Sequence, residues 1–173
     1  MGTSFRNIQI YNPGHRMNYD LEEEYCIEHL VPDWDTIFED SVETDFAEMR
    51  EEAVMLSERV DTPVISINYF DDMLFAIEVL EGGESVAYHF VGDEGVDTKN
   101  VSALMKALRL STELEIPFMN IIKKVILAPD CINFMTNLCR VPLDADYAGD
   151  APDSYEFKKL SQVLDEINGY TPI

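Results

Sequence analysis

The chain has 173 residues, of which 46% are hydrophobic and 27% charged, enough apolar material for one compact domain and unlike a disordered chain. Lys and Arg number 12 against 34 Asp and Glu, so the formal net charge is −22, which argues against nucleic acid as a partner because polyanion-binding proteins normally supply cations. No apolar stretch approaches a membrane span and the first ten residues lack a signal-peptide pattern, so we expect no membrane segment and a cytoplasmic location.

The first part of the chain predicts strands that alternate with helices. Residues 4–11 alternate apolar and polar side chains as a half-buried strand does, and Asn12-Pro13-Gly14 ends this strand as a turn. Residues 19–31 have acidic side chains at the start and an apolar face at helical spacing, so they predict a helix that Pro32 ends. Residues 33–39 predict a short strand.

A long amphipathic helix is predicted at about residues 41–60. Its apolar positions recur in steps of three and four, at Phe46, Met49, Ala53, Leu56 and Val60. Such a narrow stripe is typical of a helix that packs one face on a sheet.

Three strands are predicted next, at residues 63–70, 73–80 and 85–91, and both junctions between them suggest tight hairpins. Loops of two residues would pair Phe70 with Met73 and Leu80 with Ser85. This register places Glu78, His89 and Tyr69 on one face of the sheet, and a one-residue error in either loop would exchange the two faces.

The C-terminal part predicts a polar loop at 92–98 followed by short helices. Apolar residues at helical spacing indicate helices near 101–108, 117–125, 130–138 and 154–168. We therefore expect an α+β fold with a mixed or antiparallel sheet of four to five strands, a long helix on one face and a C-terminal layer of short helices. Residues 1–95 would form the sheet part and residues 96–173 the helical part of one compact domain.

The charge is unevenly distributed along the sequence. Residues 20–61 hold sixteen acids and two bases, a net charge of −14, whereas residues 99–140 carry a net charge of +3. Around Trp34, which could anchor a basic protein partner, the acids are Asp33, Asp35, Glu39, Asp40, Glu43 and Asp45. We predict a non-enzymatic acidic interaction module without a cofactor; the plainer alternative is that the acids only keep the protein soluble.

A second hypothesis is a small hydrolase or metal-dependent enzyme. On the predicted sheet face, Glu78 could orient His89 as a general base, with Tyr69 on the neighbouring strand. No Ser or Cys is placed as a nucleophile near this pair, so a charge-neutralising contact on the sheet is the simpler interpretation.

Two weak metal patterns are present. Asp144, Asp146 and Asp150 match the start of a calcium loop, but Ala148 and Tyr155 stand where two further ligands are needed, so we expect an acidic surface loop.

Cys26 and His29 are three residues apart on the predicted helix and could share a zinc ion, but His15 and His89 lie far away in sequence. The odd set of cysteines, Cys26, Cys131 and Cys139, predicts reduced, buried thiols instead of disulfides.

Overall fold

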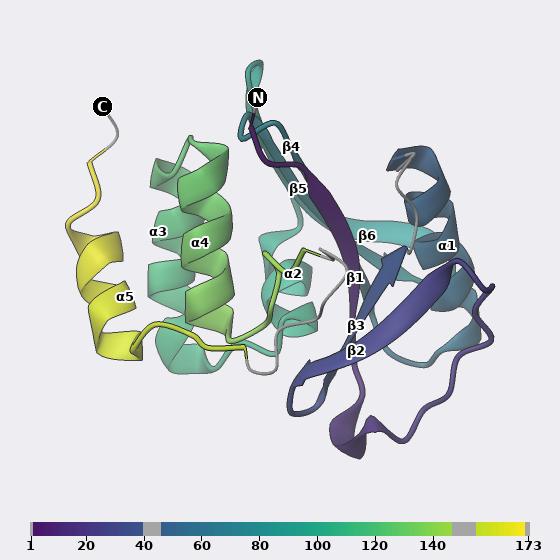
Figure 1. Cartoon of the computed structure of the whole chain (residues 1–173). Helices are drawn as coiled ribbons and strands as arrows, with labels where there is room; N and C mark the ends of the chain where they lie inside the picture. The colour runs from purple at the N-terminus through teal and green to yellow at the C-terminus, as the bar shows by residue number, and fades with distance from the viewer. Residues whose placement is uncertain (1, 40–45, 147–154, 172–173) are drawn as a thin grey trace.

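The computed structural model describes residues 2–39, 46–146 and 155–171. In these ranges seven strands form one antiparallel sheet in the order β2-β3-β1-β4-β5-β6-β7 (Figure 1). The strands are β1 (Phe5–Tyr11), β2 (Tyr25–Val31), β3 (Trp34–Glu39), β4 (Val64–Phe70), β5 (Leu74–Glu81), β6 (Glu84–Gly92) and β7 (Gly95–Lys99).

One helix lies on one side of the sheet and the remaining helices lie on the other (Figure 1). They are α1 (Phe46–Arg59), α2 (Val101–Ala107), α3 (Glu115–Lys124), α4 (Ala128–Cys139) and α5 (Leu160–Asn168), with short 3-10 turns η1 (Pro13–His15) and η2 (Thr112–Leu114). None of the described helices combines the length and apolar character that crossing a membrane requires.

The α+β class, the antiparallel sheet and the presence of several helices are confirmed. The expected size of four to five strands is wrong, because the sheet has seven. The expected long helix is also not found, since α1 has 14 residues, an ordinary helix length in globular proteins. The preceding residues 41–45 lie outside the described part of the chain.

The two strands that the sequence did not predict are the two edges of the sheet. Tyr25–Val31, predicted to be helical, pairs with β3, and Pro32 and Asp33 form the turn between them, with Asp33 at φ +67°. Gly95–Lys99, predicted to be a loop, pairs with β6 and exposes most of its residues. Edge strands bury little, so their sequences lack the apolar alternation by which strands are recognised.

The larger core lies between the sheet and the C-terminal helices. On the sheet side it contains Ile65, Ile67, Phe75, Ile77 and Val79, and from the helices it receives Leu104, Phe118, Ile121, Met135 and Leu138. All ten side chains are almost completely buried. This burial supplies the main free energy that holds the two layers together.

A buried polar network joins the sheet to the loop that follows α4. On β1, the Asn7 side-chain amide donates to the carbonyls of Leu143 and Ala145, each at 2.9 Å, and Gln9 donates to the Pro142 carbonyl at 3.0 Å. The loop thus has partners for carbonyls that water does not reach, which fixes the helical layer to the centre of the sheet.

The smaller core lies under α1. Here Met49, Ala53 and Leu56 pack on sheet residues from four strands, namely Ile8, Ile10, Ile37, Val64 and Leu80. Val64 and Leu80 pair with each other where β4 begins and β5 is close to its end. The helix therefore covers one end of this sheet face.

The predicted faces of the hairpin strands are wrong. The β4–β5 loop has three residues, because Phe70 pairs with Leu74 instead of Met73, and Asp71 and Asp72 both have positive φ. The pairing of Leu80 with Ser85 is confirmed, but a bulge next to it shifts the register of β6.

This register separates the predicted catalytic pair. Glu78 pairs with Tyr88 and lies on the α1 face, whereas His89 pairs with Ile77 and lies on the face of the C-terminal helices. The prediction that Glu78 and His89 share a face is therefore wrong.

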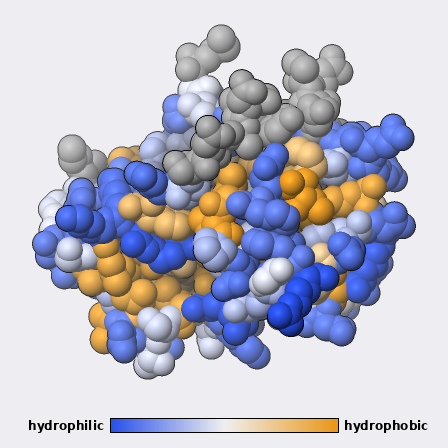
Figure 2. Space-filling model, turned by 60° about the horizontal axis from the view of Figure 1, so that its bottom comes forward, coloured by the Kyte–Doolittle hydropathy of each residue, from blue (hydrophilic) through white to orange (hydrophobic). Residues whose placement is uncertain are grey.

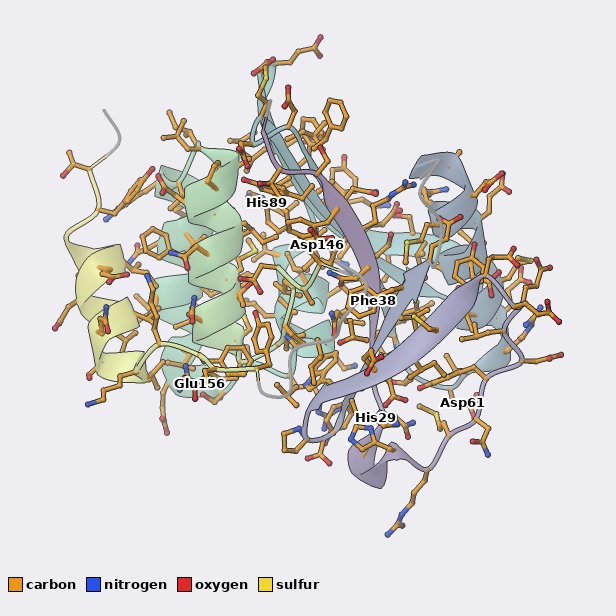
Figure 3. The ribbon with its side chains drawn as sticks, viewed as in Figure 1. His29, Phe38, Asp61, His89, Asp146 and Glu156 are labelled. Atoms are coloured by element: carbon orange, nitrogen blue, oxygen red, sulfur yellow. The ribbon has the colours of Figure 1, made fainter. Side chains whose placement is uncertain are left out.

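His89 is a buried neutral base in the larger core. Its side chain is completely buried and lies between the sheet and the C-terminal helices (Figure 3). Its Nδ1 lies 2.7 Å from Thr98 Oγ1. Its Nε2 has no hydrogen-bond partner among the described residues. Burial lowers the pKa of His89 to about 4, since the charged form would lose its hydration.

We expect acid to destabilise the fold through His89. The unfolded chain takes up this proton near pH 6.5 and the folded chain only near pH 4, so stability falls as the pH drops through that window, by about 3 kcal/mol in full. Urea unfolding of wild type and His89→Leu at pH 7 and pH 4.5 measures the difference. Equal pH dependence in the two proteins would contradict a neutral, buried His89.

Candidate functional site

The predicted partner-binding block does not form one exposed surface. Trp34 is only 6% exposed and contacts the Tyr11 ring edge-on, with ring centroids 5.5 Å apart, so most of its ring lies inside the fold. Asp35 is also buried, Asp33 is exposed and Glu39 is half-buried. The other predicted members, Asp40, Glu43 and Asp45, lie outside the described residues.

Asp35 is instead the centre of a polar cluster. Its carboxylate is 1% exposed, and its Oδ1 lies 2.5 Å from His15 Nδ1 and 2.9 Å from His29 Nδ1. Its Oδ2 accepts hydrogen bonds from Asn12 Nδ2 at 2.6 Å and from the Tyr19 hydroxyl at 2.8 Å. We call these five residues the Asp35 cluster.

The backbone around the cluster is held by further hydrogen bonds. The Asn12 side-chain oxygen accepts from the Met17 N–H at 2.9 Å, and the Asn12 N–H donates to the Asp33 carbonyl at 2.8 Å. The Asp33 carboxylate in turn accepts from the Gly14 N–H at 3.1 Å. The turn after β1 and the β2–β3 hairpin are therefore tied to each other independently of the histidines.

The electrostatics of the cluster keep Asp35 ionised. Burial by itself would raise the pKa of Asp35, but the hydrogen bonds from Asn12, His15 and Tyr19 and the nearby His29 outweigh burial and lower it. Burial and the Asp35 charge raise the pKa of the Tyr19 hydroxyl, which stays protonated and donates. The two imidazole rings are in contact, with centroids 3.9 Å apart.

Sequence reasoning missed this cluster because it predicted the wrong element. On a helix, Cys26 and His29 would share a face, but β2 is a strand, where side chains three residues apart point to opposite sides. The hairpin brings His29 to the η1 turn and to His15, at the lower end of the molecule in Figure 3. The sequence Pro32-Asp33 between two apolar runs is the turn signal that could have revealed this hairpin.

The other predicted site residues do not converge. Glu78 forms a two-pronged ion pair with Arg50, at 2.7 Å from Nε to Oε1 and 3.1 Å from Nη2 to Oε2. The Tyr69 hydroxyl donates to Asp72 at 3.0 Å, at the tip of the β4–β5 hairpin. With His89 buried on the opposite face from Glu78, the pair cannot act as a base and its orienting carboxylate.

The loop at residues 144–150, which we expected to be an acidic surface loop, is only partly described. Asp144 accepts a hydrogen bond from the Tyr155 hydroxyl, and both Asp144 and Asp146 are exposed. Asp150 lies outside the described residues. Tyr155 stands at the twelfth position of the pattern, where a calcium loop needs a carboxylate. It donates instead to Asp144 at the first position.

Among the described residues, no helix packs on the far end of the sheet face under α1. Phe70 and Met73 are 48% and 49% exposed there, and an apolar groove is lined by Asn68, Phe70, Leu74, Ala76 and Phe90. A second groove of about 330 Å³ adjoins it and shares Asn68, Ala76 and Phe90. We call this region the open face.

Carboxylates lie in the two turns at this end of the sheet and on β7. Asp71 and Asp72 are in the β4–β5 turn, and Asp93 and Glu94 are in the β6–β7 turn, which lies at the same end of the antiparallel sheet. Asp97 lines the second groove and accepts a hydrogen bond from the Tyr88 hydroxyl at 3.0 Å. The open face thus has an apolar floor and an acidic rim.

Almost all of the excess negative charge belongs to the sheet and α1. Residues 1–95 contain 23 acids and four bases, a net charge of −19, whereas residues 96–173 contain 11 acids and eight bases, a net charge of −3. A positively charged molecule is therefore attracted to the part of the chain that contains the open face.

A second group of acids lies around Tyr25 on β2. Burial raises the pKa of the Tyr25 hydroxyl, and the nearby charges of Glu39, Glu52, Glu24 and Glu48 raise it further. Burial raises the pKa of Glu52 as well; Arg59 opposes this rise, and Glu22 and Glu24 add to it.

No family model, curated protein or solved structure matches this chain. The function therefore has to be argued from the side chains of this chain alone.

We expect Glu52→Gln to stabilise the protein at neutral pH. A carboxyl whose pKa is raised by folding binds its proton more tightly in the folded state, so stability falls as the pH rises above the ordinary carboxyl range. Removing the charge should raise the free energy of unfolding at pH 7, with a smaller gain at pH 4. Thermal and urea unfolding measure the effect, and Glu51→Gln, an exposed position on the same helix, is the control. A loss of stability in Glu52→Gln would contradict a pKa of Glu52 that folding raises.

Proposed function

We propose that this chain is a protein-interaction module that binds a positively charged protein through the open face. The observation that carries the proposal is the combination, at one end of one sheet face, of partly exposed apolar side chains with a rim of carboxylates. Protein interfaces commonly have an apolar centre with aromatic anchors and a polar rim.

The apolar floor supplies binding energy that a charged surface alone would not. Phe70 is about half exposed, and the neighbouring Leu74 and Phe90 are partly exposed. Covering an aromatic side chain of this kind contributes on the order of 1–2 kcal/mol, whereas an exposed ion pair contributes less. Phe70 is therefore the residue expected to anchor a partner.

The charge selects the kind of partner. The sheet part carries a net charge of −19, so it repels acidic proteins and speeds the approach of basic ones. The Arg50–Glu78 ion pair at the inner edge of the open face is already neutral, which leaves Asp97 and the two hairpin turns as the negative contacts.

The helical side of the molecule also exposes hydrophobic residues. Figure 2 shows hydrophobic surface on the left, where the C-terminal helices lie, as well as further patches toward the right. Ile116 at the start of α3 is 76% exposed, and Ile126 and Leu127, which follow α3, are each 51% exposed. This side has little net charge, however, and only Val125 separates Lys123 and Lys124 from the exposed pair, so charge complementarity favours the open face for a basic partner.

The proposal can be tested with peptides selected from a random library against the whole chain. We expect the selected peptides to be rich in Lys or Arg with an aromatic or aliphatic residue, and their binding to weaken as salt screens the carboxylates. Phe70→Ser should weaken binding about tenfold or more. Ile116→Ser is the matched control, because it removes an exposed apolar side chain from the other side of the sheet.

Fluorescence anisotropy of the labelled peptides measures these affinities, and thermal unfolding verifies that both variants fold. Peptides without basic residues, or peptides that bind wild type and Phe70→Ser equally well, would contradict the proposal. Equal losses in Phe70→Ser and Ile116→Ser would also contradict it.

A further inference from the structure

We propose that His15, His29 and Asp35 form a binding site for a divalent transition-metal ion, for which zinc is the best fit. This site lies in the Asp35 cluster, away from the open face, and does not depend on the proposed function. One potential ligand atom from each of the three residues lies within 4.8 Å of the other two.

The three ligands come from three different segments that the fold brings to one point. His15 ends the η1 turn, His29 belongs to β2, and Asp35 belongs to β3. Both Nδ1 atoms point at the same carboxylate oxygen, Asp35 Oδ1, at 2.5 and 2.9 Å. Two imidazoles aimed at one carboxylate oxygen are already arranged around a common centre.

The distances allow an ion to enter with small movements. Zinc binds imidazole nitrogen and carboxylate oxygen at about 2.0–2.2 Å, so tetrahedral ligand atoms are roughly 3.3 Å apart. Each nitrogen-to-oxygen distance must therefore grow by less than about 1 Å. The His29 side chain is 53% exposed and the His15 side chain is 25% exposed, so both have solvent on one side into which they can turn.

The carboxylate is already oriented as a ligand. Asp35 Oδ2 is held by Asn12 and Tyr19, which leaves Oδ1 directed at the two imidazoles. Hydrogen bonds of this kind from outside the ligand set fix the orientation of metal ligands and typically improve affinity. Asn12 is itself held by the Met17 and Asp33 backbones, so the frame does not need the ion to form.

The proton balance is simple. A neutral imidazole that donates from Nδ1 to Asp35 can carry its proton on Nε2 instead, which frees the Nδ1 lone pair for the ion. The ion then replaces two N–H···O hydrogen bonds with two metal–nitrogen bonds and one metal–oxygen bond, and no redox change is needed.

The donor set decides which ion fits. Two imidazole nitrogens and one carboxylate suit zinc and its neighbours, whereas calcium and magnesium prefer oxygen ligands. With two neutral ligands and one negative ligand, a divalent ion leaves a local charge of +1, which the acidic chain attracts. Three protein ligands leave a fourth position on the exposed side, as in zinc sites that hold water.

The test is a zinc titration of the full chain by isothermal calorimetry after treatment with a chelator. Excess magnesium is present to occupy scattered carboxylates. We expect one zinc per chain, loss of this binding in His29→Ala and in His15→Ala, and unchanged binding in the control Asp20→Asn, which removes an exposed carboxylate nearby. His29 is more than half exposed, so His29→Ala should fold, and circular dichroism verifies this.

Cobalt provides a second measurement, because its visible spectrum reports the ligand geometry. We expect bands typical of a four-coordinate nitrogen and oxygen site in wild type, lost in His29→Ala and removed by added zinc. The proposal is overturned if wild type binds no stoichiometric zinc, or if folded His29→Ala binds zinc as wild type does. Peptide binding at the open face should be the same in His29→Ala and wild type, so the two proposals can fail separately.

Discussion

A buried carboxylate governs the chemistry of one end of this molecule. A charge removed from water is strongly unfavourable unless polar groups replace the lost hydration. At Asp35 four side chains do so, and they belong to the turn after β1, the segment that leads into β2, and β2 itself. The edge of the sheet is consequently fixed by hydrogen bonds where its apolar burial is small.

At the opposite end of the same sheet face, the main feature is a group of partly exposed apolar side chains. Here side chains from β4, β5 and β6 line an apolar groove and are partly exposed, and the core under α1 contains none of them in the described part of the chain. The C-terminal helices pack on the other sheet face, and the Asn7–Gln9 network fixes the loop that follows α4. The chain therefore has one completed layer and one partly open layer, and nearly all of its excess negative charge is in the sheet part.

The sequence predicted those helices and strands that bury one or both faces in a core. The strands at β1 and β3 to β6 and the apolar helices α2 to α4 are strongly patterned, because each has a face in a core. Tyr25–Val31 was predicted as a helix because an edge strand has no clear alternation, and pairing with β3 decided its structure. Such pairing is a tertiary effect that local residue preferences do not contain.

The site residues were harder to predict than the fold. The faces of β4 to β6 depended on a three-residue loop and a bulge, and either one exchanges the two sides of a strand. Trp34 and Asp35 were predicted to contact a partner, and their burial was not predictable from an acidic stretch of sequence. His15 and His29 meet only because a hairpin that was predicted as a helix folds back on a turn.

The most direct test of the proposed zinc site is an anomalous-scattering map, recorded at the zinc absorption edge from a crystal grown with zinc and excess magnesium. We predict one strong peak bounded by His15 Nδ1, His29 Nδ1 and Asp35 Oδ1, with Asn12 and Tyr19 still bonded to the other carboxylate oxygen. The account is contradicted if zinc scatters only at surface carboxylates while the two imidazoles remain hydrogen-bonded to Asp35.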